Sequence, residues 1–466
     1  MKKIVYIFLC IALFSGCNKF LDEPMKGDYS SSNIYTTVKQ ATYALNAVYN
    51  GATYSVNLWK FGDVPSDDSV KGGNDGDQPD LVYLDDWTAS ADNGVIALFW
   101  QNTYETISRA NNVIDGVEKA SFSQEVKDKL LGQARFLRAY SYFQLVNIFG
   151  NVPLKTKPQV TAENIHVGFS SPSDIYVQIE QDLSFASDVL PAVQTEAGRV
   201  TKGAALGLLA KAQLYQRKYT EALESISSLK ALGLYELDEY ENLFRLGNEN
   251  STESIFAICF LSDEIPFLGN CLNQYFAPAE EGGYYFNAPT EDWVACFDDP
   301  EDLRIDLTIG REGKDWLNDD SFSAAWAPAT GFLVRKHNQP LSEVPKGRKG
   351  DGGLAYIYLR YADILLMEAE CQMELGHPEL AEEPLNEVRQ RAGVAEKTGL
   401  SQTEMREAVR NERRIELGFE FHRFFDLMRW GETAAKAALG EDFPWTEGGF
   451  HFPVPQSELD ANQALQ

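Results

Sequence analysis

The sequence predicts a mainly α-helical protein: a scaffold of tetratricopeptide-like helical hairpins with an irregular, loop-rich lobe that contains short strands. Two observations lead to this fold class. Apolar residues recur every three or four positions over most of the chain, which is the period of one helix face. In two places an alanine is followed by another twelve positions later, Ala210 by Ala222 and Ala369 by Ala381. Small residues at this spacing are typical of the point where the two helices of a tetratricopeptide hairpin cross.

The first sixteen residues have the pattern of a secretory signal. Two lysines precede an apolar run over 4–14, and Ser15 and Gly16 come directly before Cys17. The run is too short to span a bilayer. We therefore expect residues 1–16 to be removed and Cys17 to carry lipid, since two or more acyl chains hold a domain stably at a membrane. The alternative is an ordinary signal peptide that leaves Cys17 as an unmodified thiol.

Helical periodicity predicts helices over 30–54, 95–116, 124–149, 172–190 and 202–230. Trp100 lies on the apolar face of the second of these, so we expect it in the core. The stretch 59–93 is rich in Gly, Asp, Pro and Asn and is predicted to be loop. Its acids Asp75, Asp77 and Asp80 are hard oxygen ligands at short spacing, so a calcium site is one interpretation. A solvated loop is the other, because the EF-hand spacing is absent.

Residues 254–355 are predicted to form the irregular lobe, and 356–432 the closing helical hairpins. The first arm, over 358–373, ends at Gly376 and Pro378. Pro384 falls inside the second arm and predicts that a helix restarts there, because proline suits a first helical turn and disrupts a helix interior. Ser401 and Glu404 form a capping box at the start of the third arm.

Acids and arginines alternate three or four apart from Glu412 to Arg429, along what reads as one continuous helix that ends with Trp430 in the core. This pattern predicts a lattice of salt bridges, either solvated or between helices. A catalytic carboxylate pair is the alternative, and it requires a perturbed pKa in a cleft.

The expected enzyme signatures are missing from the sequence. There is no HExxH, GxSxG, GxxxxGK[ST] or GxGxxG, and the five histidines lack metal-ligand spacing. Cys259, Cys271, Cys296 and Cys371 form no CxxC pair, although a disulfide between Cys259 and Cys271 remains open. We therefore predict no catalytic activity, no metal and no cofactor. A net charge of −28 would repel phosphate backbones, so nucleic acid is not an expected partner.

Aromatic residues make up 12% of the chain, and several fall in the two irregular regions instead of on helical stripes. Aromatic rings pack on the C–H faces of sugars, while nearby polar groups take the hydroxyls. The alternative for each ring is a loop residue that packs into the core. The candidate glycan-binding residues are Trp59, Tyr83, Trp87, Tyr284, Tyr285, Trp316 and Trp326.

Several motifs follow one another along the chain: CNKFLDEP from Cys17, Trp100 with Tyr104, Ile107 and Ala110-Asn111-Asn112, ARFLRAYSYFQLVNIFGNVPL, RYADILLMEAE, LNEVRQRAG, ERRIELGFEFHRFFDLMRWG and FPVPQSELDANQAL. Through these motifs the chain resembles the SusD/RagB outer-membrane lipoproteins of Bacteroidetes over nearly its whole length. The resemblance implies an N-terminal SusD-like domain over 17–250 and a C-terminal SusD/RagB domain over 251–466. It also implies that Asp302 and Arg304 form a structural element.

For function, the resemblance implies a lipid-anchored protein on the outer face of the outer membrane. Such a protein would capture a polysaccharide or oligosaccharide and deliver it to a SusC-like TonB-dependent transporter. Two other classes remain open: a structural interaction scaffold that binds a non-glycan nutrient or no ligand, and an undetected hydrolase. The sequence does not identify the glycan, because loops carry specificity.

Overall fold

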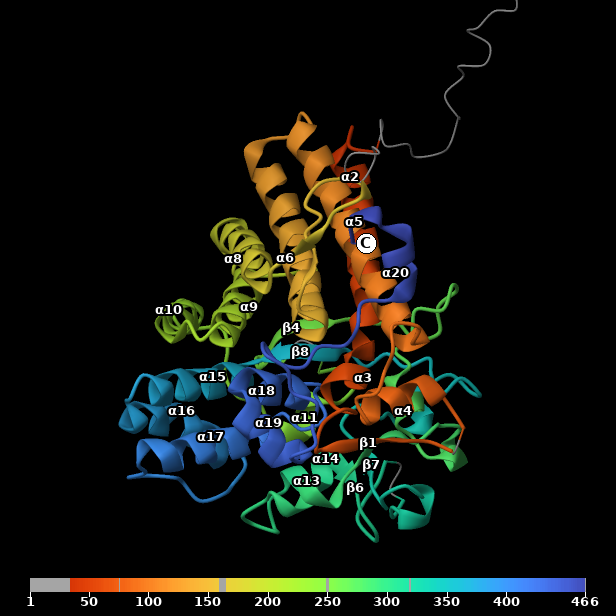
Figure 1. The fold of residues 1–466 in the computed structure, drawn as a ribbon, viewed down its shortest axis with the longest axis vertical. Helices are drawn as coiled ribbons and strands as arrows, with labels where there is room; N and C mark the ends of the chain where they lie inside the picture. The colour runs from red at the N-terminus through yellow and green to blue at the C-terminus, as the bar shows by residue number, and fades with distance from the viewer. Residues whose placement is uncertain (1–33, 75, 159–164, 249–250, 318–319, 466) are drawn as a thin grey trace, which may run out of the picture.

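The computed structural model describes residues 34–465 apart from 75, 159–164, 249–250 and 318–319 (Figure 1). The predicted signal, the predicted lipidation site Cys17 and Asp75 of the calcium hypothesis lie outside the described residues.

Three helices lie side by side at the top of Figure 1: α2 (Val38–Ala52), α5 (Gly94–Lys119) and α6 (Gln124–Phe149). The side chains of Thr37 and Asn93 cap the first two by accepting hydrogen bonds from free amides of the first turn. Trp100 is 3% exposed and packs edge-on against Phe149 at 5.0 Å between ring centroids. The prediction that Trp100 belongs to the core is confirmed.

Helical hairpins follow along the left side of Figure 1. The chain forms α8 (Pro172–Val189), α9 (Lys202–Tyr215) and α10 (Tyr219–Lys230), and later α15 (Tyr361–Glu374), α16 (Pro378–Arg391) and α17 (Gln402–Glu416). Neighbouring helices pack in sequence, and α10 packs on α15, which joins the two sets. Ala210, Ala222, Ala369 and Ala381 are all fully buried. The mainly α, tetratricopeptide-like fold class is confirmed, as is the Ser401–Glu404 capping box.

Three details of the hairpins differ from prediction. Tyr358 lies in strand β8, and the helix starts at Tyr361. Pro384 lies inside α16, which continues without a restart. The acid–arginine run is also interrupted: α17 ends at Glu416, and α18 (Arg423–Trp430) begins after a turn in which Phe419 and Phe421 have φ of 60° and 73°. Left-handed conformations at two bulky residues cannot be read from periodicity.

The prediction that 59–93 is loop is wrong in part. The segment contains α3 (Trp59–Gly62), strand β1 (Ser69–Gly72) and α4 (Pro79–Asp85), preceded by the 3₁₀ helix η2 (Thr53–Leu58). Strand β1 pairs antiparallel with β5 (Phe286–Pro289), more than two hundred positions away. A strand this short depends on a distant partner, so local composition gives no sign of it.

The irregular lobe contains the predicted short strands, paired in two-stranded sheets, and also short helices that the sequence did not predict. Strand β4 (Ser254–Ile258) pairs with β8 (Tyr356–Arg360), and β6 (Ile309–Gly310) with β7 (Leu333–Val334). The short helices of this half are α11 (Tyr240–Leu243), α12 (Leu272–Tyr275), η3 (Ala279–Glu281), α13 (Glu291–Ala295), α14 (Arg304–Thr308), η4 (Ala324–Trp326) and η5 (Leu341–Glu343). Strands β2 (Val152–Pro153) and β3 (Phe169–Ser170) pair in the first half, and α19 (Glu432–Leu439), α20 (Gln456–Ala461) and η6 (Gln463–Leu465) close the chain.

A buried network of ion pairs joins the lobe to the hairpins. Arg360, at the end of β8, contacts Glu253, Glu416 and Glu420, and all four side chains are at most 2% exposed. Arg304 reaches the same network through Glu416, at 2.9 Å, and is held by Asp302 at 2.7 Å. The salt-bridge interpretation is therefore correct in its between-helix form. The contacts also fit a structural role for the Asp302–Arg304 element.

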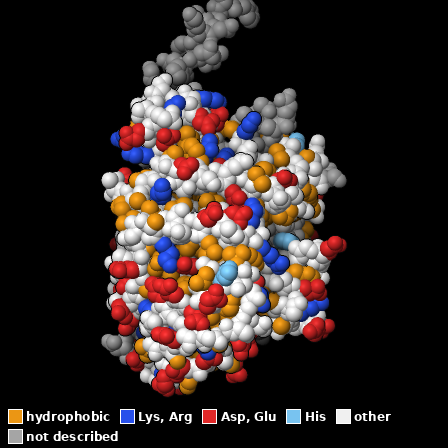
Figure 2. Space-filling view, turned by 90° about the vertical axis from the view of Figure 1, so that its left-hand side faces the viewer, with side chains coloured by type: hydrophobic (Ala, Val, Ile, Leu, Met, Phe, Trp, Pro, Cys, Tyr) orange, Lys and Arg blue, Asp and Glu red, His pale blue; other side chains and the backbone are white. Residues whose placement is uncertain are grey.

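The surface mixes charges with small apolar areas. Acidic and apolar side chains are interspersed over the face shown in Figure 2. Within the described part of the chain, no helix combines the length and apolar character needed to cross a membrane. Cys271 is a free thiol, so the disulfide with Cys259 that the sequence left open is not formed.

Candidate functional site

Two tyrosine rings lie together on the surface of the irregular lobe. Tyr275 is the last residue of helix α12, and Tyr284 follows the turn after η3. The backbone amide of Tyr284 donates a hydrogen bond to the Gln274 carbonyl at 2.9 Å. This bond brings the rings to 6.3 Å between centroids with a 40° tilt. Tyr284 is 45% exposed and Tyr275 is half-buried. With Lys60, whose ammonium lies 5.8 Å from the Tyr275 ring centre, they form what we call the tyrosine platform.

The platform rests on buried aromatic residues. Trp59 is 1% exposed and packs against Tyr275 at 5.7 Å and against Phe286 at 6.2 Å. Burial lowers the pKa of Lys60 to about 8, which leaves the amine largely charged at pH 7. The prediction that Trp59 binds glycan is therefore corrected: a side chain this deeply buried supports the platform from inside and cannot stack on a sugar.

A second aromatic group contains Tyr285, the next residue in the chain after Tyr284. Tyr285 and Trp326 pack against a small core that contains Trp316 and Phe322. Trp316 is 2% exposed, and its indole N–H donates to Glu281 at 2.8 Å. Trp316 is therefore also corrected from ligand-binding candidate to core residue, whereas Tyr285 and Trp326 are half-buried and keep some surface.

The last two candidates lie on and beside α4. Tyr83 is 48% exposed. Trp87 is half-buried, packs edge-on against Phe443 at 5.0 Å and donates its indole N–H to the Pro65 carbonyl at 2.9 Å. Among the described residues, no ring contact joins Tyr83 or Trp87 to the tyrosine platform. The structure therefore places the seven candidates in three groups instead of one.

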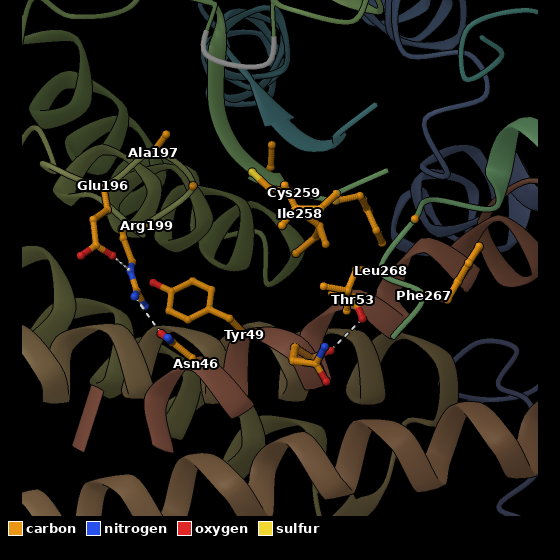
Figure 3. Close-up of a pocket in the computed structure, with 16 residues that line it drawn as sticks. Asn46, Tyr49, Thr53, Glu196, Ala197, Arg199, Ile258, Cys259, Phe267 and Leu268 are labelled. Carbon is orange, nitrogen blue, oxygen red and sulfur yellow. Dashed lines mark hydrogen bonds and ion pairs between the residues drawn. The ribbon is translucent and has the colours of Figure 1, made fainter. Parts of the chain in front are cut away.

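A groove lies between α2, the 196–199 turn and the end of β4 (Figure 3). Its volume is about 420 Å³. Arg199 spans one end: its guanidinium lies 5.0 Å from the Tyr49 ring centre, pairs with Glu196 at 2.9 Å and donates to Asn46 at 2.7 Å. Phe267 lies at the other end. The groove thus combines an apolar wall with amide, hydroxyl and charged groups, a mixture that suits a polar organic ligand.

The carboxylates give no metal site in the part of the chain that the structure describes. No group of three His, Cys, Asp or Glu side chains there could hold a metal ion. In the acidic loop, Asp77 accepts a hydrogen bond from the Asn74 side chain at 3.1 Å, and Asp80 accepts one from the Gly94 amide at 2.8 Å. These carboxylates stabilise the loop and the start of α5.

Sequence reasoning missed Tyr275 and Lys60. Tyr275 lies in the same irregular lobe as the candidates Tyr284, Tyr285, Trp316 and Trp326, so the composition criterion applied to it equally. Lys60 follows Trp59 directly, but its position over the Tyr275 ring depends on contact between α3 and α12, for which the sequence holds no local signal.

Comparisons with known proteins give consistent matches. The model described as "SusD family" matches residues 252–442, and the one described as "Starch-binding associating with outer membrane" matches residues 19–214. A SusD-like protein of Formosa agariphila is 26% identical over 99% of this chain and 97% of its own length. Among solved structures, a laminarin-binding SusD-like protein is 26% identical, with a TM-score of 0.80 over 93% of this chain and 98% of that one. Surface glycan-binding protein A from Bacteroides fluxus is 25% identical, with a TM-score of 0.78 over 92% and 97%.

Proposed function

The chain belongs to the SusD/RagB family, and on that premise we propose that it binds a glycan on the tyrosine platform. The proposal continues that the protein is a non-catalytic lipoprotein on the outer face of the outer membrane. There it would deliver the glycan to a SusC-like TonB-dependent transporter. The laminarin-binding and glycan-binding relatives support the ligand class, and the match to the family associated with the outer membrane supports the location.

The observation that carries the ligand proposal is the pairing of Tyr275 and Tyr284. Two tilted rings present an aromatic surface with phenol groups at its edge, and the Lys60 ammonium adds a donor beside it. Because buried Trp59 and Phe286 fix the rings from inside, little side-chain entropy is lost on binding.

We expect Tyr284→Ala to weaken binding of a glycan that the wild-type protein binds by roughly tenfold or more. Loss of one stacked ring should cost on the order of 1 to 3 kcal/mol. Isothermal calorimetry with laminarin- and starch-derived oligosaccharides provides the measurement.

The structure offers two matched controls. Tyr43 on α2 is 46% exposed and lies outside the platform, so Tyr43→Ala should bind as the wild type does. Tyr83 on α4 is 48% exposed, so Tyr83→Ala tests whether the surface of α4 holds the ligand instead. If Tyr83→Ala lost affinity while Tyr284→Ala did not, the platform assignment would be wrong.

For the anchor, we expect Cys17→Ala to abolish incorporation of a tagged fatty acid, because the signal pattern ends directly before this residue. Metabolic labelling of cells that express wild type or variant measures this. Equal labelling of the two proteins would contradict the proposal that Cys17 is the lipidated residue.

A further inference from the structure

An open pocket of about 610 Å³ lies between helices α17, α18 and α19, at the lower left of Figure 1. Residues Asp67 and Asp292 close one side of it, and alanines of α19 form a wall without long side chains. None of its lining residues belongs to the tyrosine platform or to the groove of Figure 3.

Trp430 lies in this pocket and is half-buried, which corrects the expectation that it belongs to the core. Its indole N–H donates to Glu370 at 3.0 Å, which fixes the ring. The guanidinium of Arg410 lies 4.6 Å from the ring centre. The ring therefore holds Arg410 by a cation–π contact.

Arg410 differs from the other arginines of α17. Arg406 pairs with Glu374 at 2.9 Å, Arg413 with Asp363 at 2.8 Å, and Arg414 with Asp68 at 2.6 Å. Arg410 has no ion pair and no hydrogen bond with any residue that the structure describes. Because no described residue accepts a hydrogen bond from it, the guanidinium of Arg410 keeps its N–H groups available to a ligand.

The other cations of the lining are already paired. Arg414 pairs with Asp292 at 2.6 Å, and Arg423 pairs with Asp67 at 2.7 Å. Glu407 is exposed and, among the described residues, has no ion pair. The pocket thus contains one positioned, unpaired cation, which suits an oxyanion bound through two N–H groups.

We propose that this pocket is a second ligand site, in which Arg410 binds the carboxylate or sulfate group of an acidic saccharide. The size of the pocket accommodates sugar rings beside the anion, and the Thr433 hydroxyl and the Asn411 amide lie in its lining. Only the saccharide part of this inference rests on the proposed function. The anion site is separate from the tyrosine platform.

The test uses the full mature chain and four probes: a galacturonate disaccharide, a sulfated disaccharide, a neutral glucose disaccharide and sodium sulfate. Calorimetry should detect binding of at least one of the two acidic saccharides, and comparison of the two identifies the anion. Arg410→Gln should weaken that binding by about tenfold or more. Glu407→Gln should strengthen it severalfold, because it removes the unpaired carboxylate near the anion.

Arg406→Gln is the matched control: it lies one turn earlier on α17 and outside the pocket lining, and it should leave binding unchanged. Arg410→Gln should leave binding of neutral laminarin- and starch-derived oligosaccharides to the platform unchanged, which separates the two sites. The proposal is overturned if neither acidic saccharide binds, if Arg410→Gln binds as wild type while melting normally, or if the neutral sugar binds this site equally well. Equal affinity for sodium sulfate alone would reject the saccharide assignment.

Discussion

Replacement of Arg360 by methionine is expected to lower the free energy of unfolding by at least about 3 to 5 kcal/mol, the usual cost of breaking a buried ion pair from one side. Methionine keeps much of the packing volume but leaves the carboxylates of Glu253, Glu416 and Glu420 without this partner. Arg360 donates to them at 2.7, 2.5 and 2.7 Å, and to the Glu416 carbonyl at 2.6 Å. Urea unfolding followed by circular dichroism measures the difference.

The control is Arg109→Met on α5. Arg109 pairs with Glu105 one turn away, and its side chain is 35% exposed. Exposed pairs of this kind contribute up to about 1 kcal/mol. Equal unfolding free energies for Arg360→Met and wild type would show that the buried network does not stabilise the junction between lobe and hairpins.

The second large effect is acid unfolding. Burial raises the pKa of Glu420, but the adjacent Arg360 and Lys336 outweigh burial and bring it down to about 2. Burial likewise raises the pKa of Asp426, and Arg413 and Arg429 lower it to about 2. Groups with a lowered folded-state pKa stabilise the fold above their unfolded pKa of about 4, and this stabilisation is lost as the pH falls toward 2.

Each of these two carboxylates should account for about 2 to 3 kcal/mol of unfolding free energy, most of it lost between pH 4.5 and 2.5. Burial raises the pKa of Asp68 to about 6, although the nearby charge of Arg414 lowers it. Asp68 therefore takes up its proton above this pH window. Urea midpoints at pH 7, 4.5, 3.5 and 2.5 measure the fall. Glu420→Gln should be less stable at pH 7 and should lose less below pH 4.5. A wild-type stability that stays constant down to pH 2.5 would contradict the prediction.

The helices could be predicted from the sequence because their signals are local. Helix α6 spans 124–149 as its apolar period predicts, and the Ser401–Glu404 box marks the start of α17. Elements that depend on distant partners could not be predicted. Strand β1 exists because β5 pairs with it, and Tyr358 belongs to a strand because β4 lies beside it.

The sequence predicted the residue types of the candidate site, but not which of those residues reach the surface. The search for aromatic residues in the irregular regions found the exposed Tyr284, but it also found the buried Trp59 and Trp316. In the sequence, a loop ring that packs inward looks the same as one that faces solvent. Arg410 was overlooked for a related reason. The alternation of acids and arginines predicts that each arginine is paired, and only the packing of α17 against Trp430 shows that this one is held by a ring instead.

The measurement that tests the central claim most directly is titration of the mature wild-type protein with laminarin- and starch-derived oligosaccharides, followed by analysis of the sugar recovered. A glycan-binding protein without catalytic activity should give saturable binding to at least one oligosaccharide, with the chain length of the recovered sugar unchanged. Absence of binding to every oligosaccharide would favour the scaffold without a glycan ligand, and shortened products would favour a hydrolase. Either result would contradict the function proposed for the tyrosine platform.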